Sequence, residues 1–274
     1  LAQSRLDCIN FKAGIFTNFS QDHLDFHISM NNYFSSKMIL FRKLLDKKKY
    51  LITDSDIKEF SLLKNIAKKR KIKILTINKK IIIPQISLIG SFQKKNFDMA
   101  VLAAKLCGIK NKKISSIVKK IKSVNGRLEL VRSLKNDSKV FIDYAHTPDA
   151  LLKAINALKD HYQSSVVLVF GCGGQRDKEK RSLMAKIANK HCTKIYVTDD
   201  NPRYENPKKI RTAIIKNLDK NKYIEIGNRK KAIEQSIKNS NPFDLILIAG
   251  KGHENFQNYG KKIINFSDKK IVKK

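Results

Sequence analysis

The sequence predicts an α/β protein whose second half is a doubly wound domain built on a mainly parallel sheet. Short apolar runs of strand length alternate with longer stretches of helical period, and each run ends in a polar or glycine-rich turn. Repetition of strand, turn and helix is typical of a parallel sheet with helices on both faces. The 274 residues, 42% of them hydrophobic, suffice for one large domain or two ordinary ones.

Four apolar runs in the second half predict the buried strands of this sheet. They span residues 140–142, 166–170, 194–197 and 245–248, and helical patterns at 148–161, 178–189 and 207–218 lie between them. In such sheets ligands bind outside the carboxyl ends of the strands, where helix N-termini offer unpaired N–H groups. The turns after these four strands are therefore the candidate site.

The first part of the chain is less regular. It predicts strands near 14–18 and at 50–53, and helices over 30–45, 57–69 and 97–106. A lysine-rich stretch at 110–122 joins it to the second part, so we expect two domains, 1–124 and 125–274. We expect the basic tail at 269–274 to be frayed surface.

The formal net charge of +33 raises the question of a nucleic-acid partner. Lysines are spread along the chain, which is also rich in Ile and Asn, a combination typical of A/T-rich codon usage. No ribonucleoprotein motif or zinc-finger spacing accompanies the charge. We interpret the lysines as solvated surface and predict no nucleic-acid partner, with a basic nucleic-acid-binding module as the alternative from a different class.

Other bulk features concern location. Since no run of about 18 apolar residues is present, we predict no membrane partner. The four cysteines Cys8, Cys107, Cys172 and Cys192 form no C-x-x-C pair, which favours structural thiols in a reducing cytoplasm. We expect a cytoplasmic monomer, and the first residues, which resemble neither a signal peptide nor an initiator segment, indicate a start within a longer protein.

Residues 18–27 read Asn-Phe-Ser-Gln-Asp-His-Leu-Asp-Phe-His, with two histidines and two carboxylates after a predicted strand. This is either a polar loop with a helix cap or a set of ligands for Mg²⁺. Lys37 follows fourteen residues after His23 among apolar and small residues. Taken alone, it is a surface lysine whose stem lies along apolar neighbours.

The second half carries four further motifs. They are Gly-Arg-Leu-Glu at 126–129, Asp-Tyr-Ala-His-Thr-Pro-Asp at 143–149, Asp-Asn-Pro-Arg at 200–203 and Gly-Lys-Gly-His-Glu at 250–254. Each alone could be a turn or a helix cap. Their order, spacing and common place at one edge of one sheet indicate a shared site.

Together these motifs resemble the Mur ligase family over essentially the whole chain, and within it the diaminopimelate-adding, MurE-type branch. The resemblance implies the C-terminal part of a central ATPase domain followed by a Rossmann-like doubly wound domain. It implies that Gln3 and Arg5 hold the nucleotide-linked substrate and that His23 binds Mg²⁺. It also implies that Lys37 is carbamylated, because CO₂ addition turns a cation that would repel the metal into a ligand.

The resemblance further implies ATP contacts from Arg127 toward phosphate, from Asp143 toward ribose, and from His146 in the same loop. Arg229 matches a position near the adenine. The specificity residues are those of the diaminopimelate-adding enzymes: Asp200, Asn201, Arg203, Gly250 and Glu254. Arg203 is central, because a guanidinium fork suits the second carboxylate that distinguishes diaminopimelate from lysine.

The implied reaction is ATP-dependent addition of meso-diaminopimelate to UDP-N-acetylmuramoyl-L-alanyl-D-glutamate through an acyl phosphate, in peptidoglycan synthesis. The alternative is a related amide ligase such as folylpolyglutamate synthetase, against which the motifs at 200–203 and 250–254 argue. Three departures stand out: Ile28 replaces a common Gly, the stretch 49–88 is short, and the family's G-x-x-G-K-[ST] loop is absent. We therefore expect the chain alone to be inactive.

Overall fold

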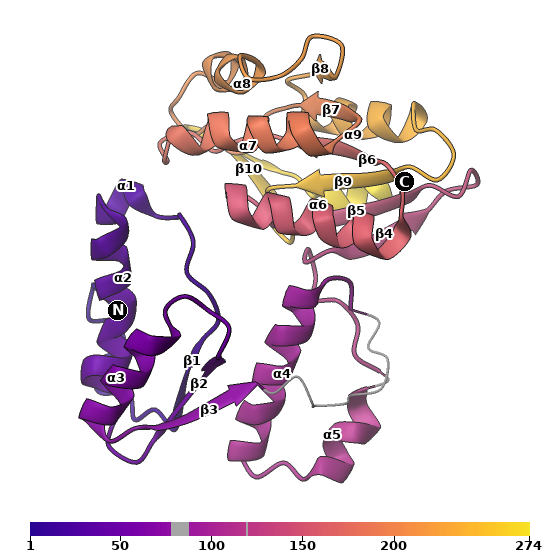
Figure 1. Ribbon diagram of the computed structural model, residues 1–274. Coiled ribbons are helices and arrows are strands. Elements are labelled where there is room, and N and C mark those ends of the chain that lie inside the picture. Colours follow the sequence, from indigo (N-terminus) through magenta and orange to yellow (C-terminus); the bar gives the residue numbers. More distant parts are fainter. Residues whose placement is uncertain (78–87, 119) are drawn as a thin grey trace. The chain divides into compact units, whose positions relative to one another are not determined.

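Two units, each with its own parallel sheet, make up the described part of the chain. The computed structural model describes residues 1–77, 88–118 and 120–274. Contacts divide the chain into Leu1–Lys122 and Ser123–Lys274, shown in Figure 1 in indigo to magenta and in rose to yellow, respectively. The prediction of an α/β fold is confirmed for both units.

The first unit is a three-stranded parallel sheet in the order β1-β2-β3 with helices packed on it. Its elements are β1 (Ala13–Phe16), α1 (Leu24–His27), α2 (Met30–Ile39), the π-helix η1 (Leu40–Leu44), β2 (Tyr50–Asp54), α3 (Phe60–Arg70), β3 (Lys73–Ile77), α4 (Ser91–Leu106) and α5 (Asn111–Val118). Phe16, Met38, Phe41 and Leu51 are at the centre of its core. The predicted helix over 30–45 therefore exists, but its last turn widens into η1.

The second unit is a six-stranded sheet in the order β4-β5-β9-β6-β7-β8, in which the β4–β5 pair is antiparallel and the other pairs are parallel. Its elements are β4 (Glu129–Ser133), β5 (Lys139–Asp143), α6 (Pro148–Tyr162), β6 (Val166–Phe170), α7 (Glu179–His191), β7 (Lys194–Val197), α8 (Pro207–Ile215), β8 (Tyr223–Glu225), α9 (Arg229–Lys238), β9 (Leu245–Ala249), β10 (Phe256–Tyr259), β11 (Lys262–Asn265) and α10 (Asp268–Val272). The prediction of a doubly wound, mainly parallel sheet is confirmed.

Helices cover both faces of this sheet. In Figure 1, α6 and α7 lie in front of it and α9 lies behind it. The face under α9 and α10 is packed with aliphatic strand residues such as Val140, Val169 and Ile248, together with Ile233 of α9 and Val272 of α10. Cys172 follows β6 and Cys192 follows α7, and both side chains are buried. Burial raises the pKa of each thiol to about 12, so both stay protonated.

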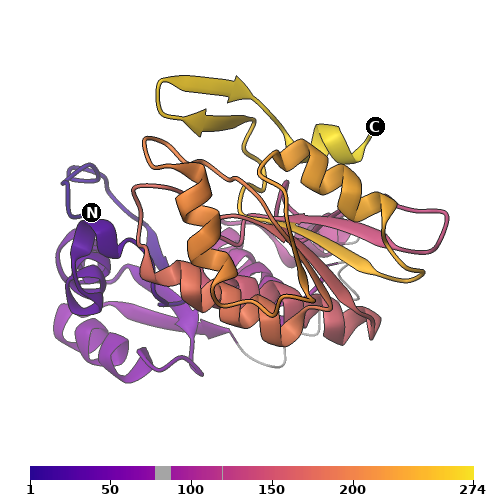
Figure 2. The ribbon, with the colours of Figure 1, turned by 90° about the horizontal axis from the view of Figure 1, so that it is seen from above.

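The antiparallel hairpin of β10 and β11, which the sequence did not predict, follows the motif at 250–254. Figure 2 shows it extending beyond the six-stranded sheet. Residues 256–259, Phe-Gln-Asn-Tyr, lack the clean apolar alternation that indicates a strand. Their structure comes instead from contacts with the turn after β7, described below.

The expectation of a frayed tail over residues 269–274 is wrong. Asp268 begins α10, and both Asp268 and Val272 are fully buried. Lys269 forms an ion pair with Glu129 of β4. The lysines that suggest a disordered tail occupy the outer face of this helix, while the residues at i and i+4 anchor it.

None of the helices in the described ranges combines the length and apolar character that crossing a membrane requires.

The anchor of α10 is a buried ion pair. Arg229 Nε lies 2.8 Å from Asp268 Oδ1 and Arg229 Nη2 lies 2.8 Å from Asp268 Oδ2, with both side chains fully buried. Burial disfavours the charge on Arg229, but Asp268 outweighs this and raises the pKa of the guanidinium. The charge is therefore present and depends on its partner.

We expect Asp268→Ala to lower the free energy of unfolding by about 3–5 kcal/mol, because it leaves the Arg229 charge buried and unpaired. Urea denaturation followed by circular dichroism measures the change. The control is Asp219→Ala, which removes an exposed partner of Lys222 and is expected to cost under about 1 kcal/mol. Equal losses for the two variants would contradict a structural role for the Arg229–Asp268 pair.

Candidate active site

Four turns at the carboxyl edge of the second sheet meet in the structure, as the sequence order predicts. Gly250 N, after β9, donates to Asp143 O at the end of β5 (3.1 Å). Thr198 N, after β7, donates to Phe170 O at the end of β6 (3.0 Å). The backbone therefore joins the turns after β5 and β9 to each other, and likewise the turns after β6 and β7.

The turn after β6 is glycine-rich because the turn after β7 lies directly against it. A Cβ on Gly171 would lie 2.1 Å from Thr198 O, and one on Gly174 would lie 1.9 Å from Pro202 O. Gly174 N also donates to Asn201 O (3.0 Å). No side chain fits at either glycine, so the Asp-Asn-Pro-Arg segment is seated on bare backbone.

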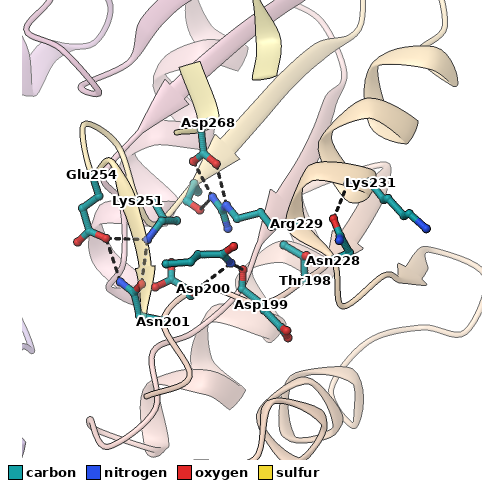
Figure 3. A network of polar contacts seen from close by, with 12 residues as sticks. Thr198, Asp199, Asp200, Asn201, Asn228, Arg229, Lys231, Lys251, Glu254 and Asp268 are labelled. Carbon is teal, nitrogen blue, oxygen red and sulfur yellow. Dashed lines mark hydrogen bonds and ion pairs between the residues drawn. The ribbon is translucent and has the colours of Figure 1, made fainter. Parts of the chain in front are cut away.

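Asn201 is the centre of the polar network in Figure 3. Its Oδ1 accepts hydrogen bonds from Lys251 Nζ (3.0 Å) and from Asn258 N (3.0 Å), and its Nδ2 donates to Glu254 Oε2 (2.9 Å). Lys251 Nζ also lies 2.7 Å from Glu254 Oε2. Asn201 and Lys251 are buried, so the motifs at 200–203 and 250–254 act as a single unit.

The Glu254 carboxyl is ionised in this network. Burial alone raises its pKa, but hydrogen bonds from Lys251 and Asn201 and the nearby charge of Arg203 outweigh burial, so the pKa lies below its ordinary value. An ionised carboxylate at this place is suited to an ammonium group.

Arg203 adopts a left-handed backbone conformation, with φ of +54°. Its Nη1 donates to Gly174 O (2.9 Å), and its backbone N donates to Asn258 O (2.9 Å). A left-handed non-glycine residue costs about 1 kcal/mol or more and is common at functional sites. The guanidinium is thus aimed along the glycine turn.

Two further side chains, Gln257 and Arg181, bind residues next to or within the Asp-Asn-Pro-Arg segment at 200–203. Gln257 Nε2 donates to Asp199 O (3.1 Å) and to Asp200 O (3.0 Å), which explains why the β10–β11 hairpin is ordered. On the other side, Arg181 of α7 binds Glu205 with two hydrogen bonds (2.7 and 2.8 Å). The hydrogen bonds from Arg181 lower the pKa of Glu205 to about 2.

The turn after β5 is ordered by Asp143. Its carboxylate accepts from Leu128 N and from Ala145 N, both at 2.7 Å, and burial raises its pKa despite these bonds. The exposed Arg127 guanidinium lies 4.4 Å from the ring centroid of Tyr144, and His146 Nδ1 lies 2.8 Å from Tyr144 O. Asp143 therefore brings Arg127 and His146 together at one edge.

Arg229 and its neighbour Asn228 have structural partners. Asn228 is the N-cap of α9, its side chain accepting from Lys231 N (3.0 Å), a role that Asn fills as well as Asp. Besides binding Asp268, Arg229 Nη2 donates to Ala249 O (3.0 Å), directly before Gly250. The side chain that the resemblance places near adenine is thus fully buried beneath the turn after β9.

In the first unit, His23 and Lys37 each lie near the ring of Tyr33. The His23 ring centroid lies 5.9 Å from that of Tyr33, and Lys37 Nζ lies 4.9 Å from the same centroid. Asp22 Oδ2 lies 3.3 Å from His23 Nε2. Within the described ranges, no group of three or more His, Cys, Asp or Glu could hold a metal ion, so a metal here requires a further ligand.

The first unit offers the imidazole of His23 and the carboxylate of Asp22 as possible ligands for Mg²⁺, which prefers oxygen ligands. Ile28, four residues from Leu24, has φ of +66° and is 85% exposed. A β-branched residue is strained there, so the departure from Gly falls where glycine suits the backbone. Gln3 and Arg5 are exposed in the turns before β1.

Family models match most of the chain. The Mur ligase middle domain matches residues 1–81, and the Mur ligase glutamate ligase domain matches residues 126–252. The chain belongs to the Mur ligase family. The second match covers the motifs at 126–129, 143–149 and 200–203 and ends at Gly252, within the motif at 250–254.

Two curated relatives of this Mur ligase chain carry the same enzyme name. The chain is 40% identical over 300 residues to the UDP-N-acetylmuramoyl-L-alanyl-D-glutamate--2,6-diaminopimelate ligase of Rickettsia montanensis. This match covers 100% of the chain and 62% of that protein. The protein of the same name from Haemophilus influenzae is 36% identical over 301 residues, covering 99% and 61%. The chain thus spans about three fifths of the length of these relatives.

Solved structures of Mur ligases and related synthases share the fold. A structure of a UDP-N-acetylmuramoyl-L-alanyl-D-glutamate--2,6-diaminopimelate ligase matches with a TM-score of 0.56 and 28% identity, covering 99% of the chain and 61% of that structure. The Mycobacterium tuberculosis folylpolyglutamate synthase complexed with ADP and AMPPCP matches with a TM-score of 0.72 and 16% identity, covering 89% and 62%. At that identity the second likeness shows the fold alone.

Reasoning from the sequence missed several residues that hold the candidate site together. Lys251 stood in a quoted motif but was assigned no role, although a lysine between two glycines was a signal of close packing. Arg181, Glu205 and Gln257 lie outside the motifs and left no signal, because their partners are 24 to 58 residues away. Long-range side-chain pairing of this kind is set by the fold.

The low pKa of Glu205 gives a stability prediction. A carboxyl whose folded pKa is about 2, against an unfolded value near 4.5, stabilises the fold above about pH 4.5, and this stabilisation is lost as pH falls toward 2. We expect Glu205→Gln to lower the free energy of unfolding by about 2–3 kcal/mol at pH 7, with the difference from wild type shrinking toward pH 2. Urea midpoints at several pH values measure it.

The control is Glu234→Gln, which removes an exposed carboxylate from its contact with Lys230 and is expected to change stability little at any pH. A Glu205→Gln penalty that stays constant from pH 7 to pH 3 would show that the Arg181–Glu205 contact is not an ion pair of the folded state.

Proposed function

We propose that the protein containing this chain is an ATP-dependent amide ligase that adds meso-diaminopimelate to UDP-N-acetylmuramoyl-L-alanyl-D-glutamate. One observation carries the proposal: Asn201 and Arg203 of the motif at 200–203 and Glu254 of the motif at 250–254 form one network at the carboxyl edge of the sheet. The name shared by the relatives from Rickettsia and Haemophilus supports the choice of substrate.

The network suits an amino acid with two charged ends. The ionised Glu254 offers a carboxylate to an ammonium group, and Arg203 offers a guanidinium to a carboxylate. Lysine lacks the second carboxylate, so with lysine bound the guanidinium would remain without that partner, which penalises lysine. Meso-diaminopimelate is the acceptor that satisfies both groups.

The reaction has two balanced steps. The γ-carboxylate of D-glutamate attacks the γ-phosphorus of ATP, so that ADP leaves and an acyl phosphate forms. The neutral amine of the acceptor then attacks the acyl carbon, phosphate leaves, and the amine loses a proton as the amide forms. Transfer of this kind depends on positioning and on neutralising negative charge.

The residues of this chain divide those tasks. Arg127 lies on an exposed edge where it can meet phosphate oxygens, and Asp143 and His146 shape the turn beside it. His23 and Lys37, the latter as a carbamate, would hold Mg²⁺, which would supply positive charge at the transferring phosphate. Gln3 and Arg5, both exposed, bind the nucleotide-linked substrate.

We assign residues 1–124 to the C-terminal part of the central ATP-binding domain and residues 125–274 to the C-terminal domain. Cytoplasmic location and a monomeric state belong to the same proposal. A folylpolyglutamate-type ligase is the second candidate, because the Asp-Tyr-Ala-His-Thr-Pro loop at 143–148 resembles a loop that such ligases share. The Asp-Asn-Pro-Arg and Gly-Lys-Gly-His-Glu motifs favour diaminopimelate.

The proposal is tested on the full-length protein that contains this chain. Phosphate release is measured with UDP-N-acetylmuramoyl-L-alanyl-D-glutamate, ATP and either meso-diaminopimelate or L-lysine. We expect a strong preference for meso-diaminopimelate, and Arg203→Ala is expected to lower kcat/KM for it by about 30-fold or more, because one partner of a charged pair is removed.

Arg203→Lys is the matched variant, since it keeps the charge but loses the guanidinium fork. It should recover little of the preference. Equal use of lysine by the wild type would leave a ligase but overturn the role of Arg203, and activity only with folate acceptors would favour the second candidate.

The chain alone is expected to release no phosphate from ATP. Residues 1–274 contain no G-x-x-G-K-[ST] loop, and Gly-Cys-Gly-Gly-Gln-Arg-Asp at 171–177 lacks its Lys-Ser or Lys-Thr pair. The measurement is phosphate release by the purified 274-residue chain beside the full-length protein. Turnover by the chain above a heat-denatured blank would contradict this expectation.

A further inference from the structure

Lys251 is a fully buried lysine in a motif whose assigned members are its neighbours Gly250 and Glu254. Its Nζ has three partners: Asn201 Oδ1 at 3.0 Å, Glu254 Oε2 at 2.7 Å, and the Phe256 ring, whose centroid is 5.4 Å away. Figure 3 shows its side chain between the turn after β7 and the turn after β9. The ammonium group is therefore satisfied inside the protein and does not extend to solvent.

The two donors that reach Glu254 use the same oxygen. Lys251 Nζ and Asn201 Nδ2 both bind Oε2, at 2.7 and 2.9 Å. Within the described ranges, Oε1 receives no hydrogen bond that the structure records, and the Glu254 side chain is 19% exposed. The carboxylate is therefore fixed through one oxygen, with the other available to a ligand.

Stability alone does not account for a lysine at this position. Replacing a buried ion pair by apolar side chains of similar volume is often neutral or stabilising, so a buried pair is weak evidence for a purely structural role. Its partners point to recognition: Asn201 and Glu254 both belong to the proposed acceptor site.

The charges around Glu254 keep it ionised. The cations that face it are Lys251 from its own turn, Arg203 from the turn after β7, and Arg229 from α9. Arg203 and Arg229 also serve other partners, whereas Lys251 donates directly to the carboxylate.

We propose that Lys251 is a positioning residue that, together with Asn201, fixes Glu254 Oε2 and thereby directs Oε1 to the ammonium group of the acceptor amino acid. The inference rests on the proposed function and deepens it, because it names the group that orients the acceptor. Without Lys251, the carboxylate turns more freely and gains a proton at a higher pH, and both changes weaken its hold on a cation.

The test compares Lys251→Met with wild type in the full-length ligase at pH 8 and pH 6. Removal of a hydrogen bond to a charged group is expected to raise the acceptor KM by about 10-fold at pH 8. The rise is larger at pH 6, where more of the variant's Glu254 is protonated. The KM for ATP and kcat at saturating acceptor stay within about twofold, since neither depends on Oε1.

Lys251→Gln is the second variant, because glutamine keeps a donor but removes the charge. It is expected to recover part of the KM at pH 8 and less at pH 6. Lys262→Met, on the exposed face of β11, is the matched control and should leave every parameter unchanged.

Several outcomes overturn the inference. They are an unchanged acceptor KM in Lys251→Met, an equal change in the KM for ATP, a KM ratio that does not depend on pH, or failure of both Lys251 variants to fold, which would make the lysine structural. Turnover by the wild type reports separately on the proposed function, so absence of ligation in the wild type is distinct from failure of the Lys251 prediction.

Discussion

The ion pair between Arg229 and Asp268 is the contact on which the candidate site in the second unit depends. It joins the first residue of α9 to the first residue of α10, and the same guanidinium donates to Ala249 O, directly before Gly250. Arg229 Nη1 is buried and, in the described ranges, has no hydrogen-bond partner. A buried charge costs free energy unless it is paired. The Arg229–Asp268 pair therefore fixes one arrangement of α9, α10 and the turn after β9, because any other arrangement would leave the Arg229 charge unpaired.

In the rest of the site, the backbone of the turn after β6 lies so close to the backbone of the turn after β7 that no side chain fits between them. Gly171 and Gly174 admit no Cβ, so the Asp-Asn-Pro-Arg segment rests on main-chain atoms that have no rotamers. Arg203 then adopts φ of +54°, and the strain is offset by hydrogen bonds at its backbone N and its guanidinium. Recognition groups on such a base are pre-organised, which lowers the entropy lost on binding.

The parts of this molecule that were predictable from sequence are those with local signals. Val166–Phe170 is a continuous apolar run before glycines, and the structure begins and ends a strand at those same residues. The helix starts at Pro148 and Pro207 were also predicted. The N-cap residues Thr147 and Asn206 and the prolines that follow them favour a helix start through the first turn alone, so the signal is local. By contrast, β10 is set by Gln257, whose partners Asp199 and Asp200 lie 58 and 57 residues away. The buried role of Asp268 was hidden for the same reason among the lysines of the last residues.

Arginine and lysine are used differently in this strongly basic chain. Ten of its 57 basic residues are arginine, and three of these hold carboxylates in the second unit: Arg181 with Glu205, Arg211 with Asp199 and Glu225, and Arg229 with Asp268. Each of the three makes two or more hydrogen bonds to carboxylates with one guanidinium, which an ammonium group cannot do with the same geometry. Lys251 is a fully buried lysine of this unit, and it serves as a compact point charge between one amide oxygen, one carboxylate oxygen and one ring. The net charge of +33 thus belongs to the surface of the protein. In the interior of the second unit, each of these cations is held in place by hydrogen bonds to the anion that it binds.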